Sequence, residues 1–219
     1  MKMYLKVVVF FLSTLIILSC KQKMENKGVA TDIANASGFK QFTEVKSLEF
    51  TFNIEKDTVH VVRHWKWLPG EKKVTFYDKT DSTTFKIMDT STAALKKLNA
   101  QFTNDEYWLT FPFHLQTDNG YTFTGGDTAT GPVTDKKLRK YTVQYNSKDG
   151  FTPGDMYDIY TDEQHMIQEW AYHKTGVKDP SLMTSWDNYG DFGGIKFAEE
   201  HKTKDGSFRL FFTGITVAK

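Results

Sequence analysis

The chain has 219 residues, of which 39% are hydrophobic and 15% aromatic. This length and composition suit one globular domain with a sizeable core and argue against wholesale disorder. The formal net charge is +1, so the sequence carries no basic field that would attract nucleic acid, and no nucleic-acid partner is expected.

The N-terminus has the pattern of a targeting signal. Lysines stand at positions 2 and 6, and residues 7–18 form an apolar run that only Ser13 and Thr14 interrupt. A run of twelve residues is too short to span a membrane as a helix. Ser19 and Cys20 follow it, and Cys20 is the only cysteine in the chain. No internal disulfide can form, so stability must come from packing.

This junction resembles that of bacterial lipoproteins, in which a small residue precedes a cysteine that is diacylated, for example with palmitate, and becomes the new N-terminus. The resemblance implies a signal peptide over residues 1–19, lipidation of Cys20, a polar tether over residues 20–28 and one β-rich domain over residues 29–219. The membrane is then a partner through the lipid anchor. An ordinary secretory leader with a chance cysteine is the alternative, because positions 17 and 18 depart from the lipoprotein pattern.

The first third of the domain is predicted to be a series of short strands. A weak helical pattern over residues 29–42, broken by Gly38, comes first. Apolar and polar residues then alternate with the period of a half-buried strand. The predicted strands cover residues 45–54, 58–67, 73–78 and 83–89.

The middle of the chain changes to helical spacing. Leu95, Leu98 and Phe102 share one face of a helix predicted over residues 92–102, with Thr90 or Ser91 as its cap. A second short helix is predicted to begin at Asn104 and to end before Pro112, because an N-cap signal opens it and proline closes it. Residues 107–115 also alternate with period two, so a strand is the alternative there.

The second half of the chain returns to strand patterns separated by two long loops. Residues 116–137 are predicted to form a mobile loop with at most one short strand at residues 121–124, and residues 176–194 form another loop. The sum is nine or ten antiparallel strands in a mainly β fold, a curved sheet with a helical insertion across its concave side. The predicted strands of this half cover residues 138–146, 156–161, 166–173, 195–203 and 208–217.

No motif for catalysis or metal binding is convincing. His60 and His64 lie on one strand face, but a zinc site would need a third ligand from elsewhere, and two surface histidines are the simpler interpretation. Asp155, Asp158 and Asp162 do not have the spacing of a calcium loop. Because no nucleophile motif is present, we expect no enzyme, no cofactor and no metal.

The sequence has more aromatic residues than a small β-meander needs to close on itself. They indicate either a large filled core or a lined apolar cavity, and the sequence does not separate the two. The rings that we expect to line a cavity belong to Trp65, Trp67, Trp108, Phe111, Phe113, Trp170 and Tyr172. If Phe111 and Phe113 pack against the sheet with no void beneath them, this segment is a plug rather than the wall of a site.

Four blocks of sequence resemble those of an uncharacterised group of bacterial lipoproteins. More distantly, the leader and the long meander interrupted by helices are similar to the lipoprotein-localisation superfamily, LolA/LolB-like and LppX-like. That resemblance implies a half-open barrel that binds acyl chains beneath helices. The four blocks are Trp65–Pro69, Tyr107–Phe113, Gly150–Asp158 and Glu169–Tyr172.

The sequence therefore leads to the hypothesis of a membrane-anchored, non-catalytic periplasmic lipoprotein that binds an acyl chain, a lipid or the lipid of a lipoprotein. The expected location is the envelope of a Gram-negative bacterium. In some lipoproteins an aspartate after the cysteine is associated with retention in the inner membrane. Lys21 follows Cys20 here, so the outer membrane is expected. One alternative is a structural or interaction lipoprotein with a filled core. A third is a metal-dependent hydrolase, which would need three side chains from the set His60, His64, His114 and His201 to converge.

Overall fold

The structure, a computed structural model, describes residues 28–146 and 153–219. Seven strands form the larger sheet: β1 Ser47–Lys56, β2 Val59–Leu68, β3 Lys73–Tyr77, β4 Ser82–Lys86, β10 Asp187–Asp191, β11 Lys196–Lys202 and β12 Phe208–Ala218. Five form the smaller sheet: β5 Tyr121–Thr130, β6 Lys137–Tyr145, β7 Met156–Thr161, β8 Ile167–His173 and β9 Leu182–Ser185. The helices cover residues 28–36, α2 Phe39–Phe42, the 3-10 turn Pro69–Glu71 and α3 Ala93–Thr117.

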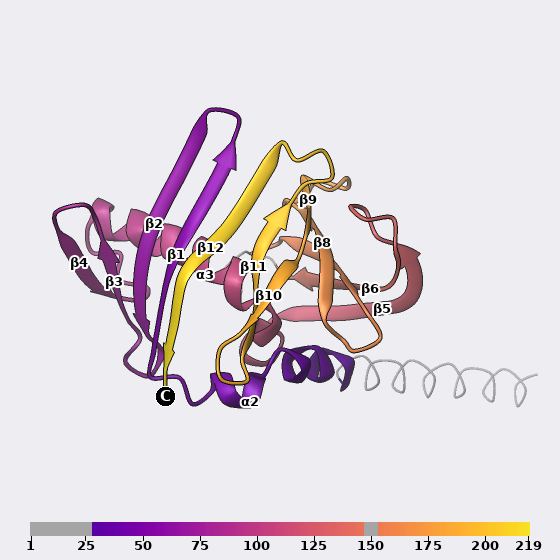
Figure 1. The fold of residues 1–219 in the computed structure, drawn as a ribbon, viewed down its shortest axis with the longest axis horizontal. Helices are drawn as coiled ribbons and strands as arrows, with labels where there is room; N and C mark the ends of the chain where they lie inside the picture. Colours follow the sequence, from indigo (N-terminus) through magenta and orange to yellow (C-terminus); the bar gives the residue numbers. More distant parts are fainter. Residues whose placement is uncertain (1–27, 147–152) are drawn as a thin grey trace, which may run out of the picture.

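Both sheets are antiparallel, and they are not closed into a barrel. The larger sheet has the order β10-β11-β12-β1-β2-β3-β4, and the smaller has the order β5-β6-β7-β8-β9. The last strand pairs with the first, with Phe52 opposite Phe212. β9 lies beside β11, where the two sheets meet, and α3 runs behind the strands of the larger sheet (Figure 1).

The predicted strands of the first third form because one face of each strand is buried. Leu48, Phe50 and Phe52 are fully buried, whereas Glu49 and Thr51 between them face outward and are partly exposed. This is the period-two alternation of a sheet with one covered face. The mainly β, antiparallel fold with a helix packed against its strands is confirmed. The strands form two sheets rather than one curved sheet, and the described residues contain twelve strands rather than nine or ten.

The helical insertion differs from the prediction. A single helix of 25 residues, α3, is capped by Thr92, whose hydroxyl accepts a hydrogen bond from the Leu95 amide, and it continues through Pro112. Asn104 therefore lies inside this helix and does not cap a second one. The strand alternative for residues 107–115 is wrong as well.

Burial on two sides explains why the helix passes through proline. Tyr107 and Phe111 pack into a core with the smaller sheet, whereas Leu109 and Phe113 pack into a core with the larger sheet. An internal proline costs about 3 kcal/mol, while each large apolar side chain removed from water contributes about 1.5–3 kcal/mol. The packing outweighs the local signal, and α3 is the element that both sheets share.

Two segments predicted as loops contain strands. β5 extends to Thr130 because Gly125 and Gly126 form a bulge in a strand that pairs with β6 throughout. In the second loop, β9 completes the smaller sheet and β10 begins at the edge of the larger one. The buried Trp186 lies between them, where the chain passes from one sheet to the other. Strands as short as β9 and β10 show little alternation of apolar and polar residues, so the sequence alone does not reveal them.

The N-terminal segment follows the prediction, with helices on both sides of Gly38. Gly38 has φ 90°, and a Cβ there would lie 2.0 Å from the carbonyl oxygen of Gly194, so only glycine fits this contact. Cys20, the signal peptide and all of the tether except Gly28 lie outside the described residues.

Candidate ligand cavity

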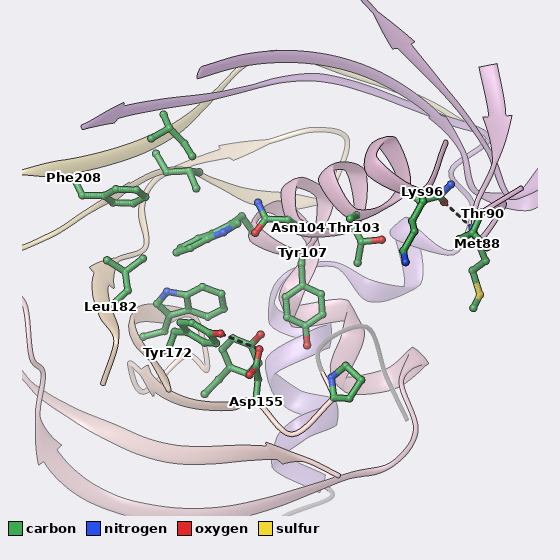
Figure 2. Close-up of a pocket in the computed structure, with 18 residues that line it drawn as sticks. Met88, Thr90, Lys96, Thr103, Asn104, Tyr107, Asp155, Tyr172, Leu182 and Phe208 are labelled. Carbon is green, nitrogen blue, oxygen red and sulfur yellow. Dashed lines mark hydrogen bonds between the residues drawn. The ribbon is translucent and has the colours of Figure 1, made fainter. Parts of the chain in front are cut away.

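A cavity of about 860 Å³ lies between α3, the smaller sheet, the C-terminal part of β1 and the N-terminal part of β12. Its volume is within the range of about 300–1,000 Å³ that is usual for sites holding one small ligand. Figure 2 shows the lining side chains. They are Ile54, Met88, Thr90, Lys96, Asn99, Ala100, Thr103, Asn104, Tyr107, Trp108, Pro153, Asp155, Tyr157, Trp170, Tyr172, Leu182, Phe208 and Leu210.

One face of α3 forms a long wall of this cavity. Lys96, Ala100, Thr103 and Tyr107 line it at intervals of three or four residues, which places them on one helical face, and Trp108 lines it beside Tyr107. The twelve residue-to-residue steps from Lys96 to Trp108, at about 1.5 Å each, make this wall about 18 Å long. Its character changes along the way, from exposed polar side chains near the start of α3 to aromatic rings in the middle.

The inner end of the cavity is built from aromatic rings. The centroids of Trp108 and Trp170 are 4.4 Å apart, and Tyr157 stacks on Trp170 at 5.1 Å. Tyr107, Tyr157 and Trp170 are at most 4% exposed. Together with Leu182 and Phe208 they make a surface that suits a hydrocarbon chain, because an apolar ligand gains free energy by leaving water.

The predicted lining residues divide into two groups. Trp108, Trp170 and Tyr172 line the cavity. The other four rings, which belong to Trp65, Trp67, Phe111 and Phe113, pack into the two cores and do not line it. Phe111 and Phe113 therefore plug the space between the sheets, while the preceding turn of the same helix faces the cavity.

Several residues that line the cavity cannot be recognised as such from the sequence. Lys96, Ala100 and Thr103 are ordinary helix-surface residues, and only the position of the smaller sheet turns this surface into a wall. The rings that fill the core and those that line the cavity look the same in sequence, because burial at both is set by partners far along the chain.

An ion pair fixes α3 against the larger sheet. The Arg63 guanidinium donates two hydrogen bonds to Asp105, at 2.5 and 2.6 Å, and the Trp65 indole donates a third at 2.8 Å. Asp105 is fully buried. Burial raises the pKa of the Asp105 carboxyl group, against the opposing effect of Arg63. These contacts set the position of the helix wall relative to β2.

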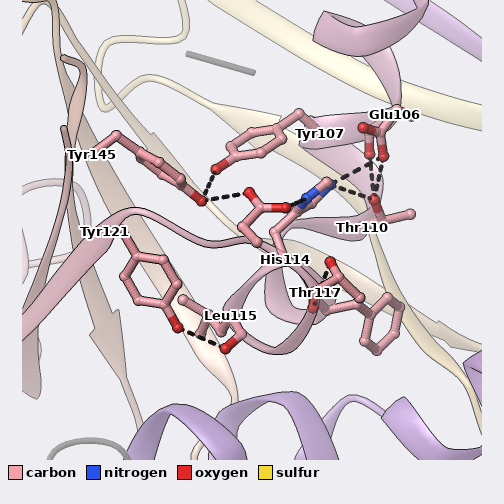
Figure 3. Close-up of polar contacts among 10 residues, drawn as sticks. Glu106, Tyr107, Thr110, His114, Leu115, Thr117, Tyr121 and Tyr145 are labelled. Carbon is pink, nitrogen blue, oxygen red and sulfur yellow. Dashed lines mark hydrogen bonds and ion pairs between the residues drawn. The ribbon is translucent and has the colours of Figure 1, made fainter. Parts of the chain in front are cut away.

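A buried polar network lies along the C-terminal half of α3 (Figure 3). His114 lies 3.2 Å from a Glu106 oxygen and 2.9 Å from an Asp118 oxygen. Tyr107 donates to the Tyr145 hydroxyl at 2.6 Å, and Tyr145 donates to Asp118 at 2.8 Å. Burial alone would lower the pKa of His114, but Glu106 and Asp118 outweigh it and raise the pKa to about 10. The network links the cavity residue Tyr107 to the end of the helix.

The histidines do not assemble into a metal site. His60 is exposed and His64 pairs with Glu49 on the outer face of the larger sheet, while His114 and His201 are buried at separate places. In residues 28–146 and 153–219, no group of three or more His, Cys, Asp or Glu side chains is arranged to hold a metal ion. No helix among the described residues is long and apolar enough to cross a membrane.

The chain matches no family model and no curated protein. Its fold is similar to that of a putative outer membrane lipoprotein-sorting protein domain from Vibrio parahaemolyticus, with a TM-score of 0.50 at 8% identity, covering 90% of this chain and 94% of that one. A DUF1329 family protein from Desulfovibrio piger aligns with a TM-score of 0.49 at 8% identity over 90% and 93% of the two chains. A LolA superfamily protein from Nitrosomonas europaea gives 0.45 at 6% identity over 87% and 94%.

At these identities the likeness concerns the fold alone. At that level, the expected likeness in fold to a lipoprotein-sorting domain is confirmed.

Proposed function

We propose that this protein is a non-catalytic lipoprotein of the bacterial envelope, anchored through Cys20 in the outer membrane, that holds an acyl chain in the cavity beneath α3. The observation that carries the proposal is the ring-lined inner end of that cavity, where Trp108 and Trp170 meet. A solved structure with a similar fold is described as a putative outer membrane lipoprotein-sorting protein domain, which is consistent with a lipid or a lipoprotein lipid as ligand.

The dimensions of the cavity support this ligand class. The wall of α3 from Lys96 to Trp108 is about 18 Å long. One leaflet of a bilayer, half of a hydrocarbon core of about 30 Å, has a depth of about 15 Å. An acyl chain of ordinary membrane length therefore matches the wall, and each methylene that it buries contributes about 0.8 kcal/mol before the costs of association.

Native mass spectrometry of the full protein after gentle extraction from membranes tests the proposal. We expect an adduct with the mass of a lipid or fatty acid, and we expect it to be reduced in Ala100→Trp, which fills the cavity from the α3 wall. Ala94→Trp is the matched control, because Ala94 is an exposed residue of the same helix and does not line the cavity. A wild-type protein that stays free of lipid and takes none up would refute the proposal.

One observation favours the alternative of an interaction lipoprotein with a filled core. Phe111 and Phe113 are almost fully buried and close the space between the sheets. Under that alternative the cavity is only an indentation of the surface. Ala100→Trp would then leave the mass spectrum unchanged, and the protein would bind other envelope proteins without a lipid.

A further inference from the structure

The polar end of the cavity indicates which kind of acyl ligand fits. Building on the proposed function, we propose that the ligand is a single-chain amphiphile with an anionic head, a carboxylate or a phosphate, and that Lys96 binds this head at the mouth. The tail then extends along α3 towards Trp108 and Trp170.

The two ends of the cavity differ in exposure and in chemistry. Figure 2 shows Lys96, Thr90 and Met88 together at one end, and Phe208, Leu182 and Tyr172 at the other. Met88 is 78% exposed, and Lys96 and Thr90 are exposed as well. A charged head can stay in contact with water at this end, while the tail loses contact with water at the ring-lined end.

Met88 is held at the mouth by the turn that leads into α3. It has φ 70°, and its backbone amide donates to the side-chain oxygen Oδ1 of Asn99 at 2.7 Å. The Asn99 amide group donates in turn to the carbonyl oxygens of Asp89 and Leu95. Asn99 is therefore occupied in fixing the turn, and the cation of the neighbouring Lys96 remains as the head-binding group.

The charged residues that line the cavity indicate the charge of the ligand's head group. Lys96 and Asp155 are the two charged residues among those that line the cavity. Asp155 is already satisfied, because one of its oxygens accepts hydrogen bonds from the amide and hydroxyl of Thr175 and the other accepts one from Tyr172 at 3.0 Å. Among the described residues, no carboxylate lies within ion-pair distance of Lys96. At the end of the cavity where Lys96 lies with Thr90 and Met88, the charged lining residue is therefore Lys96, and its charge is positive.

The volume of the cavity suits one small amphiphile. Its volume of about 860 Å³ is typical of sites for a single small ligand. The hydroxyl groups of Thr90 and Thr103, which also line the cavity, can donate hydrogen bonds to the oxygens of a carboxylate or phosphate. A free fatty acid or a lysophospholipid with a phosphate head satisfies both conditions.

Calorimetric titration of the full protein with four ligands that share a twelve-carbon tail tests this inference. The probes are dodecanoate, dodecyl phosphate, dodecan-1-ol and dodecyltrimethylammonium. We expect the two anionic probes to bind about threefold to tenfold more tightly than the alcohol and the cation to bind most weakly. The preference should shrink at high salt, because the pair at the mouth is exposed to solvent. The tighter of the two anions identifies the head as a carboxylate or a phosphate.

Lys96→Met removes the charge and keeps an unbranched side chain. It should abolish the preference for the anions and leave the affinity for dodecan-1-ol unchanged. Lys97→Met is the matched control, since Lys97 is an exposed neighbour that does not line the cavity, and it should behave as the wild type. Equal binding of all four probes, unaffected by Lys96→Met, would overturn the inference about the head and leave the proposed function standing. Failure of every probe to bind would overturn both.

Discussion

His114 is a buried cation held between two carboxylates, and this predicts how stability depends on pH. Its pKa is raised to about 10 from the ordinary 6.5 by Glu106 and Asp118, which outweigh burial. A raised pKa in the folded state contributes stability that is complete below about pH 6.5 and is lost as the pH rises through about 10. We expect the free energy of unfolding of the wild type to fall between pH 6.5 and pH 9.5, measured by urea denaturation.

His114→Gln isolates this effect. The variant should be less stable than the wild type by about 3–5 kcal/mol at pH 6.5, because Glu106 and Asp118 lose their cation in a buried place. By pH 9.5 the difference should become smaller. If the two proteins lose stability in parallel over this range, His114 does not carry the charge that we assign to it.

Asp105 provides a second prediction on single residues. It is fully buried and accepts hydrogen bonds from Arg63 and Trp65. Asp105→Ala leaves the Arg63 cation without its partner and should cost about 3–5 kcal/mol in unfolding free energy. Glu49→Ala breaks the partly exposed pair with His64 and should cost no more than about 1 kcal/mol. Similar losses in the two variants would contradict the structural role of the Arg63–Asp105 pair.

Gly125 lies at the β-bulge that lets β5 continue to Thr130. It has φ 100°, and a Cβ there would lie 2.7 Å from the Lys140 carbonyl oxygen on the neighbouring strand β6. Gly125→Ala should lower the free energy of unfolding by about 1–3 kcal/mol, because the bulge forces a side chain into a strained conformation. Gly70→Ala is the control, since Gly70 has open space around it and no positive φ. Thermal unfolding of both variants checks this, and an unchanged midpoint for Gly125→Ala would contradict the bulge.

The elements that the sequence predicted correctly are those with one buried face. In β1, the alternation of Leu48, Phe50 and Phe52 follows directly from burial on one side, so the pattern is visible without a structure. The sequence predicts two short helices in place of α3, because Asn104 resembles an N-cap and Pro112 a helix end. Packing of α3 against both sheets overrides these local signals. The glycines of β5 are indistinguishable in sequence from those of a loop. The cavity could be predicted only in part, because residues such as Ala100 acquire their role from the distant smaller sheet.

At the scale of the whole molecule, the proposed lipid anchor at Cys20 predicts where the protein lies in the cell. We expect Cys20→Ala to move the protein from the membrane fraction to the soluble fraction, because two acyl chains provide stable anchoring and one or none does not. Separation of membranes by sedimentation, followed by detection of the protein, measures this. A variant that remains with the membranes would contradict lipidation at this position.

The proposed function requires that the cavity beneath α3 hold an acyl chain. The most direct measurement is a fluorescence titration of the purified protein with cis-parinaric acid, a fatty acid that emits when it enters an apolar site. We expect saturable binding of one molecule to the wild type and to Ala94→Trp, and binding at least about tenfold weaker to Ala100→Trp. Absence of saturable binding to the wild type, or equal binding to Ala100→Trp, would contradict the claim.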